Sequence, residues 1–227
     1  MAEITEQELL QSIREGFDKA FSETDQILNG KASNRGSGRL SSRFVYQVSS
    51  AIYERLDRRS PGLCLRVIEV DEFGKRTSGE WLVDACITEE KCDSKKLRFI
   101  DRIVFAMESE SDTAQRAFNK DFAKLVHLKA KYKLYLNGLD HKTPNGMRNY
   151  TRRRCKYAEA VLNRIRPSGE FYLGFWPSPR KPDKSPDSVD SIWKRLQCGE
   201  WRHLNGIRLW RFDTCARKLI EVRPEGG

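Results

Sequence analysis

The sequence predicts an α/β protein in which helices flank a central mixed β-sheet. Apolar residues recur at helical spacing near the N-terminus, and two strand-like runs then follow on either side of a turn. Further along, a helical pattern lies between two more strand patterns. Because a hairpin pairs antiparallel strands and a strand–helix–strand unit pairs parallel ones, the sheet is expected to contain both arrangements.

Two helices are expected in the N-terminal part. Residues 4–29 place apolar side chains at intervals near the period of an α-helix. These side chains are Leu9, Leu10, Ile13, Phe17, Phe21 and Ile27. The Gly/Ser-rich stretch Gly30 to Ser42 has almost nothing to bury, so it is predicted to be a mobile loop. A second helix is expected from Ser41 or Ser42 to about Arg59.

The middle of the chain is expected to supply most of the sheet. Its predicted elements are a strand at 63–70, a turn within 71–79, a hairpin partner at 80–87, a charged loop at 88–96, a strand at 97–108, a helix at 113–129 and a short strand at 132–136. Ser111 or Asp112 is a suitable N-terminal cap for this helix.

The C-terminal part is expected to pack on the same domain. Its predicted elements are a basic helix at 146–166, a strand at 170–176, a proline-rich loop at 177–186, a short helix at 189–196 and a hairpin of strands at 206–212 and 218–222. The roughly 40 residues after the proline-rich loop are too few for a second core. We therefore expect one domain over 1–227, with a helical part at 1–62, a core at 63–138, a basic helix and strand at 139–177 and an extension at 178–227.

Charge indicates the class of partner. Lys and Arg number 42 against 32 Asp and Glu, so the formal net charge is +10 and the isoelectric point is about 9.4. Nucleic acid is the commonest partner of a basic intracellular surface. An anionic membrane or an acidic protein would fit the same excess. Hydrophobic residues at 38% suffice to close a core.

Several other classes find no support in the sequence. The chain opens with polar and acidic residues and contains no apolar run of membrane-spanning length, so a cytoplasmic protein without a membrane segment is expected. The six cysteines include no CxxC pair, and His127, His141 and His203 have no metal-ligand spacing. Reduced thiols are therefore expected. The phosphate-binding, dinucleotide-binding and serine-hydrolase glycine motifs are also lacking.

Three carboxylates form the pattern that points to chemistry. Asp84 lies in the apolar run Trp81-Leu-Val-Asp84, where a carboxylate is costly unless it is paired or binds a cation. Glu108 and Glu110 end the next predicted strand and point to the same face, because strand side chains alternate. Three such groups at one sheet end would make an oxygen-rich site for Mg²⁺, for which Mn²⁺ can substitute.

The order of these residues resembles a known nuclease superfamily. The sequence resembles the PD-(D/E)XK superfamily, in its Glu-x-Glu variant of the BamHI type. The resemblance lies in the order of three features: Asp84, then Glu108-Ser-Glu110, then a helix that contains Asn119-Lys-Asp-Phe-Ala-Lys124. The resemblance covers about residues 63–138. It implies a restriction-endonuclease-like core in which the acidic residues of two neighbouring strands hold the metal and activate water.

The resemblance departs from the family pattern at one position. Glu110 stands where the family usually has lysine, and in other members that lysine has moved to the following helix. The charge-stabilising role is therefore open between Lys124, Lys120 and no lysine at all. Glu54 in the second helix and Glu80 at the start of the Asp84 strand are weaker candidates. In the family an upstream helix often adds an acidic residue to the metal site, and Glu54 matches that by location only.

Each of these residues also has a purely structural interpretation. The Glu108-Ser-Glu110 segment could be a solvated acidic edge, and Asp84 could occupy the solvent face of its strand. Lysines such as Lys120 and Lys124 on an amphipathic helix are usually surface residues. The joint order of the residues favours the metal site over these alternatives.

A basic helix is expected to contact the nucleic-acid backbone. On the helix at 146–166, one stripe carries Arg148, Arg152 and Lys156, and Arg153 and Arg154 adjoin it. A solvated helix face is the alternative. Further basic or aromatic candidates lie in loops and near the C-terminus: Arg35, Arg39, Arg180, Lys181, Lys184, Trp193, Trp201 and Trp210.

These patterns together predict a metal-dependent endonuclease that hydrolyses DNA, with RNA not excluded. Such an enzyme would serve in restriction, phage defence or mobile-element processing. It would act as a homodimer or together with other subunits of a nuclease system. One alternative is a non-catalytic nucleic-acid-binding protein on the same fold, in which the absence of lysine at position 110 indicates that nuclease activity has been lost. Another is an interaction protein whose basic surface meets an acidic partner.

Overall fold

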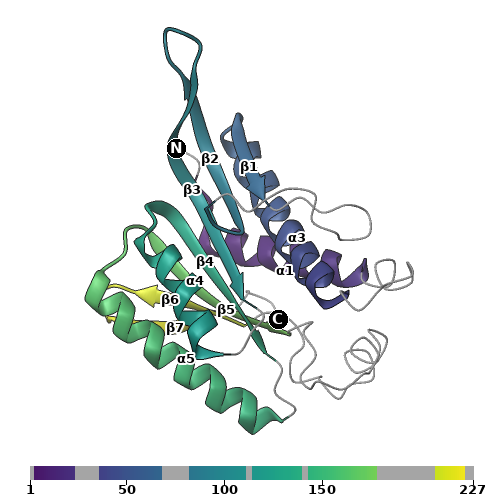
Figure 1. The fold of residues 1–227 in the computed structure, drawn as a ribbon, viewed down its shortest axis with the longest axis vertical. Coiled ribbons are helices and arrows are strands. Elements are labelled where there is room, and N and C mark those ends of the chain that lie inside the picture. The colour runs from purple at the N-terminus through teal and green to yellow at the C-terminus, as the bar shows by residue number, and fades with distance from the viewer. Residues whose placement is uncertain are drawn as a thin grey trace.

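The structure is a computed structural model that describes residues 3–23, 36–67, 82–110, 114–139, 143–177 and 208–222. Within these residues seven strands form one sheet whose order follows the chain (Figure 1). The strands are β1 (Leu63–Val67), β2 (Ala85–Cys92), β3 (Arg98–Glu110), β4 (Ala130–Leu139), β5 (Glu170–Pro177), β6 (Arg208–Asp213) and β7 (Lys218–Val222). The described helices are α1 (Glu6–Ser22), α3 (Gly36–Arg59), α4 (Gln115–His127) and α5 (Pro144–Ile165).

The sheet is mixed, as predicted. Strands β1, β2 and β3 form an antiparallel meander. β3, β4 and β5 are parallel, with α4 and α5 as the two crossovers, and β6 and β7 then add antiparallel strands. Because parallel strands end at the same edge of a sheet, the carboxyl ends of β3, β4 and β5 lie together.

Helices cover both faces of the sheet. One apolar cluster joins α1 and α3 to strand residues such as Phe105 and Met107. A second cluster joins α4 and α5 to the opposite face, with Ala106 among its members. Since side chains alternate along a strand, Glu108 and Glu110 continue the series of Ala106 and face α4.

The N-terminal helices pack closely against each other. A Cβ atom on Gly16 would lie 2.5 Å from the Cα of Val48, so only glycine fits this crossing. Helix α3 begins at Gly36, and the predicted loop is therefore wrong for residues 36–42. Once a helix has formed, adding a residue to it requires little free energy. The buried part of α3 therefore stabilises the preceding Gly/Ser-rich turns, whose residues have low helix propensity. Beyond residue 23, the predicted end of the first helix lies outside the described residues.

The β2–β3 hairpin differs most from expectation. β2 starts at Ala85, after bends at residues 82–84, and runs to Cys92, so the loop predicted over 88–96 is wrong for its first half. The charged side chains that indicated a loop form ion pairs with neighbouring strands: Glu89 with Arg102, Glu90 with Arg66, and Lys91 with Asp101. Such cross-strand pairs satisfy charges along a ladder that extends beyond the core.

The two crossover helices begin differently. Ala114 precedes α4 without a side-chain hydrogen bond, and the predicted caps at 111 and 112 lie outside the described residues. The hydroxyl of Thr143 caps α5 by accepting a hydrogen bond from Gly146 N at 3.1 Å, and Pro144 occupies the first turn. The predicted start of α5 is therefore two residues late.

The C-terminal hairpin extends the main sheet. β6 pairs with β5, and the Trp210 ring meets Phe175 edge-on with centroids 5.1 Å apart. The Nε atom of Arg211 lies 3.0 Å from the Glu6 carboxylate of α1. The predicted hairpin is confirmed, whereas the predicted helix at 189–196 and all but the first residue of the proline-rich loop lie outside the described residues.

Two further features concern the hydrophobicity of the helices and the state of the cysteines. In the part of the chain that the structure describes, no helix is both long and apolar enough to cross a membrane. The described cysteines are free thiols: Cys64, Cys86, Cys92, Cys155 and Cys215.

Candidate active site

Asp84 lies at the end of the sheet where β3 ends. Ala85 pairs with Met107 in antiparallel register, so Asp84, one residue earlier, lies across from Glu108. The Asp84 Oδ2 atom accepts a hydrogen bond from the backbone N of Ser109 at 2.8 Å. With only 9% of its surface exposed, the Asp84 carboxylate is held against the end of β3.

Glu108 is a buried carboxylate beside a second one. Its exposure is 2%, and burial raises its pKa from the usual 4.5 to about 8. The negative charge of Asp84 contributes to this rise, so the two carboxylates lie within electrostatic reach of each other. A pair of carboxylates out of water repels itself and is stabilised by a cation between them.

Lys124 is the helical lysine that contacts Glu108. Its Nζ atom lies 2.8 Å from Glu108 Oε1 and 3.2 Å from Asp121 Oδ1. The hydrogen bond and the charge of Lys124 lower the pKa of Glu108, but less than burial raises it. Lys120, one turn earlier on α4, is exposed. Of the two lysines that the sequence left open, the structure therefore places Lys124 at Glu108.

Asp121 was missed at the sequence level. It lies on α4, three residues before Lys124, with 15% of its side chain exposed. Its charge also raises the pKa of Glu108, so it lies within electrostatic reach of that carboxylate. The signal was its spacing: on a helix, residues three apart share a face, and Lys124 was already a candidate.

Glu110 lies at the same strand end but in a different local network. It pairs with Asn137 of β4, whose side-chain Nδ2 donates to the Glu110 carbonyl at 3.1 Å. The hydroxyl of Tyr150 in turn donates to Asn137 Oδ1 at 2.7 Å. These buried hydrogen bonds join the end of β3 to α5 through the backbone of Glu110.

The donor set can be compared with the needs of a divalent cation. Within the described ranges, no three Asp, Glu, His or Cys side chains are grouped to hold a metal ion, so the expected three-carboxylate grouping is not assembled there. Mg²⁺ commonly binds one or two carboxylates and completes its shell with water and substrate phosphate. The pair Asp84 and Glu108 fits that requirement.

The basic stripe on α5 is exposed. Arg148, Arg152, Arg153 and Lys156 all face solvent. The guanidinium of Arg148 contacts Asn145, and that of Arg152 donates to Asn149 Oδ1 at 2.9 Å, so both are oriented along the helix surface.

Arg154 does not belong to this exposed surface. Only 4% of it is accessible, and its guanidinium lies 4.8 Å from the ring centroids of both Phe118 and Tyr150. It also donates to the side chain of Gln115 on α4. The sequence run could not separate Arg154 from its exposed neighbours, because the inward direction of a helix face depends on what packs against it.

The weaker candidates lie elsewhere. Glu54 is on the surface of α3, where its carboxylate is 3.9 Å from Arg58, and His127 is exposed at the end of α4. Trp210 is buried in the core. Arg39 lies in the first turns of α3, and nothing is described of its side chain. The remaining candidates lie outside the described residues: Arg35, Glu80, His141, Arg180, Lys181, Lys184, Trp193, Trp201 and His203.

Comparison with protein-family models, with curated proteins and with solved structures found no match to this chain.

Proposed function

We propose that this protein is a metal-dependent nuclease that hydrolyses phosphodiester bonds in DNA, with Asp84 and Glu108 as its metal ligands. The observation that carries the proposal is the Asp84–Glu108 pair at the end of β3, with the Lys124 ammonium 2.8 Å from Glu108. The same residues are those of the resemblance to the PD-(D/E)XK superfamily. Membership of that superfamily and a restriction-endonuclease-like core are part of this proposal.

Each side chain has a distinct role in the proposed mechanism. A bound Mg²⁺ or Mn²⁺ would lower the pKa of a water and neutralise charge on the phosphate. The hydrogen bond from Ser109 N orients Asp84. Lys124 stabilises the charged form of Glu108 in a buried place, and it lies where it can reach a phosphate oxygen beside that carboxylate. Glu110 is the candidate third ligand.

The exposed face of α5 supports nucleic acid as the substrate. The hydrogen bonds from Tyr150 to Asn137 and from Asn137 to Glu110 O place the first half of α5 near the proposed metal site. Arg148 and Arg152, exposed on that half, would contact phosphates of the bound nucleic acid. A role in restriction, phage defence or mobile-element processing is compatible with such a site, as is action as a homodimer or with other subunits.

Incubation of the purified chain with plasmid DNA and with RNA, in Mg²⁺, Mn²⁺ or EDTA, tests the proposal. We expect cleavage that requires the metal, with loss of activity to background in Asp84→Asn and Glu108→Gln. Asp18→Asn is a matched control, because Asp18 is an exposed carboxylate on α1. Lys124→Met should reduce the rate by about 10²–10³-fold, as removal of a charge-stabilising group does, and Lys120→Met should leave it unchanged.

One observation favours a second candidate function. Position 110 carries glutamate, and the three-carboxylate grouping is not formed within the described residues. A non-catalytic nucleic-acid-binding protein on the same fold would bind DNA with the same affinity in EDTA and in Mg²⁺. Absence of cleavage in both metals, combined with metal-independent binding, would replace the nuclease by this function.

A further inference from the structure

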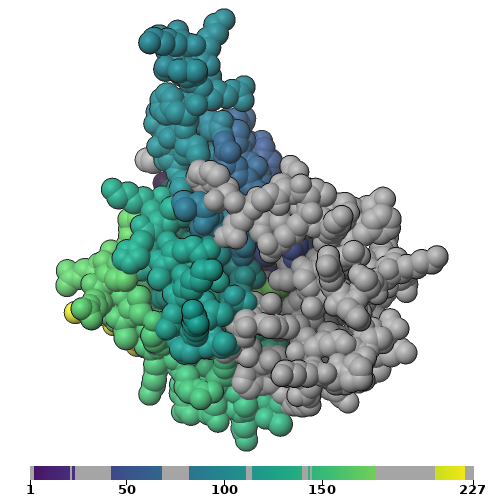
Figure 2. Space-filling view, in the orientation of Figure 1, coloured from purple at the N-terminus to yellow at the C-terminus, as the bar shows by residue number. Residues whose placement is uncertain are grey.

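The outer part of the β2–β3 hairpin stands away from the rest of the molecule. We refer to residues 89–102 as the arm; it projects beyond the sheet in Figure 1 and above the body in Figure 2. Residues 91–99 are all exposed. A segment that buries so little adds nothing to the core, so its residue types need another explanation.

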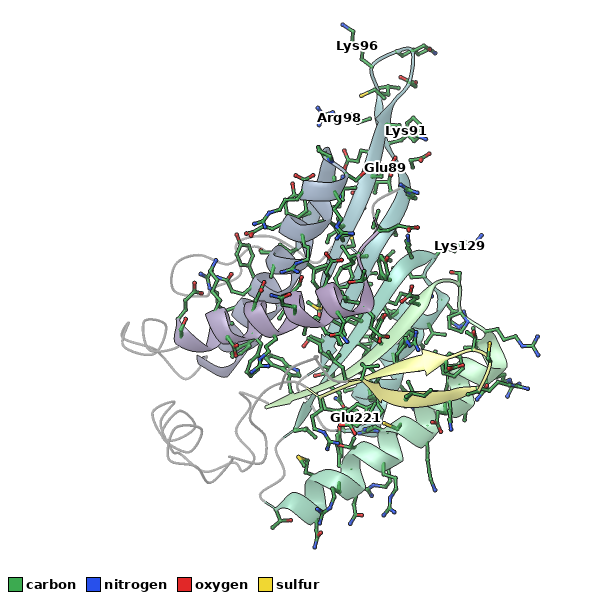
Figure 3. The ribbon with its side chains drawn as sticks, turned by 180° about the vertical axis from the view of Figure 1, so that it is seen from behind. Glu89, Lys91, Lys96, Arg98, Lys129 and Glu221 are labelled. Atoms are coloured by element: carbon green, nitrogen blue, oxygen red, sulfur yellow. The ribbon has the colours of Figure 1, made fainter. Side chains whose placement is uncertain are left out.

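Charges at the base of the arm are paired, whereas the tip carries unpaired cations. Glu89, Glu90 and Asp101 each bind a basic side chain. The Asp93 carboxylate accepts hydrogen bonds from the backbone N of Lys95 and Leu97 and so forms the turn. Among the described residues, Lys95, Lys96 and Arg98 form no ion pair. Figure 3 places Lys96 at the tip and Arg98 just below it.

Two large apolar side chains accompany these cations. Leu97 is 63% exposed and Phe99 is 48% exposed. Phe99 lies in β3 and pairs across the hairpin with Lys91, and Leu97 immediately precedes this strand. Exposed apolar side chains flanked by cations suit a partner that offers both an anionic surface and an apolar one.

We propose that the arm is a β-ribbon that enters the major groove of duplex DNA, with Lys95, Lys96 and Arg98 on phosphates and Leu97 and Phe99 against base edges. The inference rests on the proposed function, because it takes DNA as the substrate. A major groove about 12 Å wide admits a two-stranded ribbon, and thymine methyl groups provide apolar contacts within it. A second copy of this chain is a poorer partner, because its own arm would bring the same cations.

Strand β3 sets the spacing between the arm and the candidate site. Arg98 and Glu108 are ten residues apart on this strand. At about 3.3 Å per residue they are separated by roughly 30 Å, close to the ~34 Å of one turn of B-DNA. The arm therefore meets the duplex about one helical turn from the bond that the site would cleave.

Binding of the full chain to a duplex of about 24 base pairs, measured in EDTA by fluorescence anisotropy over a range of salt, tests the arm. Lys95→Ala/Lys96→Ala/Arg98→Ala should weaken binding about tenfold or more and reduce the salt slope by about 3, since each lost phosphate contact removes about 0.9. Leu97→Ser/Phe99→Ser should weaken binding with an unchanged slope. A matched control is Arg14→Ala/Lys19→Ala/Arg58→Ala, which removes three exposed cations from α1 and α3.

Several outcomes would overturn the inference. One is equal DNA binding by the arm variants and the control, and another is no duplex binding by the native chain. A third is a change in the sedimentation of Leu97→Ser/Phe99→Ser while its DNA binding stays intact, which would make the arm a self-association surface. Failure of the proposed function is distinguishable from these. A native chain that cleaves nothing but binds duplex through the arm would remove the nuclease and leave the arm in place.

Discussion

Glu108 carries its charge where the protein interior disfavours it. Its pKa is raised to about 8 by burial and by Asp84, whereas in the unfolded chain it returns to about 4.5. Between those values the folded protein holds a proton that the unfolded chain has lost, so the free energy of unfolding falls as the pH rises. Such a residue is unfavourable for stability in the metal-free protein, which is typical of functional carboxylates.

Replacement of Glu108 should therefore stabilise the metal-free protein. We expect Glu108→Gln to raise the free energy of unfolding by about 1–3 kcal/mol at pH 8 and to have no stabilising effect near pH 4. Urea denaturation in EDTA at both pH values measures the difference. A less stable variant at pH 8 would mean that the Glu108–Lys124 ion pair is a net structural contact.

Lys133 is a second buried charge, with a structural role. It is fully buried in β4, burial lowers its pKa from 10.5 to about 8, and its ammonium donates to Leu128 O at 3.0 Å. Below pH 8 both folded and unfolded chains are protonated, so folding bears the whole desolvation cost, and this cost shrinks between pH 8 and 10.5.

We expect Lys133→Met to raise the free energy of unfolding by about 1–2 kcal/mol at pH 7, because the lost hydrogen bond offsets part of the gain. The gain should decline towards pH 10. Thermal and urea unfolding at pH 7 and pH 10 measure it. A variant that is destabilised at pH 7 would show that the cap on the α4 carbonyl outweighs the buried charge.

At the scale of elements, α5 has an exposed basic face and a buried basic residue. If the exposed face contacts phosphates, Arg152→Ala/Lys156→Ala should reduce the salt slope of DNA binding by about 2, while stability stays the same. The control Lys19→Ala/Arg58→Ala removes two exposed cations from the other helices. Anisotropy titrations at several salt concentrations provide the slopes, and equal slopes for the two variants would exclude this face.

Arg154 should behave in the opposite way. Its guanidinium lies between the Phe118 and Tyr150 rings, an arrangement that an ammonium cannot reproduce. We expect Arg154→Lys to lower the free energy of unfolding by about 1–2 kcal/mol and to leave the salt slope unchanged. Chemical denaturation and the same anisotropy titrations test both parts, and a reduced slope would return Arg154 to the binding surface.

Elements were easier to predict than their limits or their faces. The alternation of residues 97–108 located β3, and the helical pattern after it located α4 with its two candidate lysines, Lys120 and Lys124, because both are local patterns. The length of β2 was missed, since its charged outer half is stabilised by partners such as Arg66 that only the tertiary fold brings near. The burial of Arg154 likewise depends on the packing of α5 against α4. The approach of Asp121 to Glu108 depends on the packing of α4 on the sheet.

At the scale of the whole molecule, the C-terminal hairpin is joined to the same sheet as the candidate site. Trp210 packs on Phe175, and Arg211 contacts Glu6 at the other end of the chain. The described elements should therefore unfold together, as small single domains do.

We expect Trp210→Ala to lower the stability of the entire chain by about 3 kcal/mol, as truncation of a large buried aromatic side chain does. The variant should retain one transition. Calorimetry, with tryptophan fluorescence and far-UV circular dichroism as independent probes, tests this. Two separated transitions, only one of which moves in the variant, would show that the extension is an independent unit.

The exposed outer half of the β2–β3 hairpin has a consequence for how this chain can change over time. Side chains at residues 91–99 contact water on both faces of the ribbon, so most substitutions there leave the interior of the protein as it was. Glu108 at the other end of β3 has no such latitude, because it is buried between α4 and the sheet. One strand thus joins a segment that tolerates variation to one that does not. If the arm contacts DNA as proposed, new target preferences can arise at the tip without a change at the carboxylates.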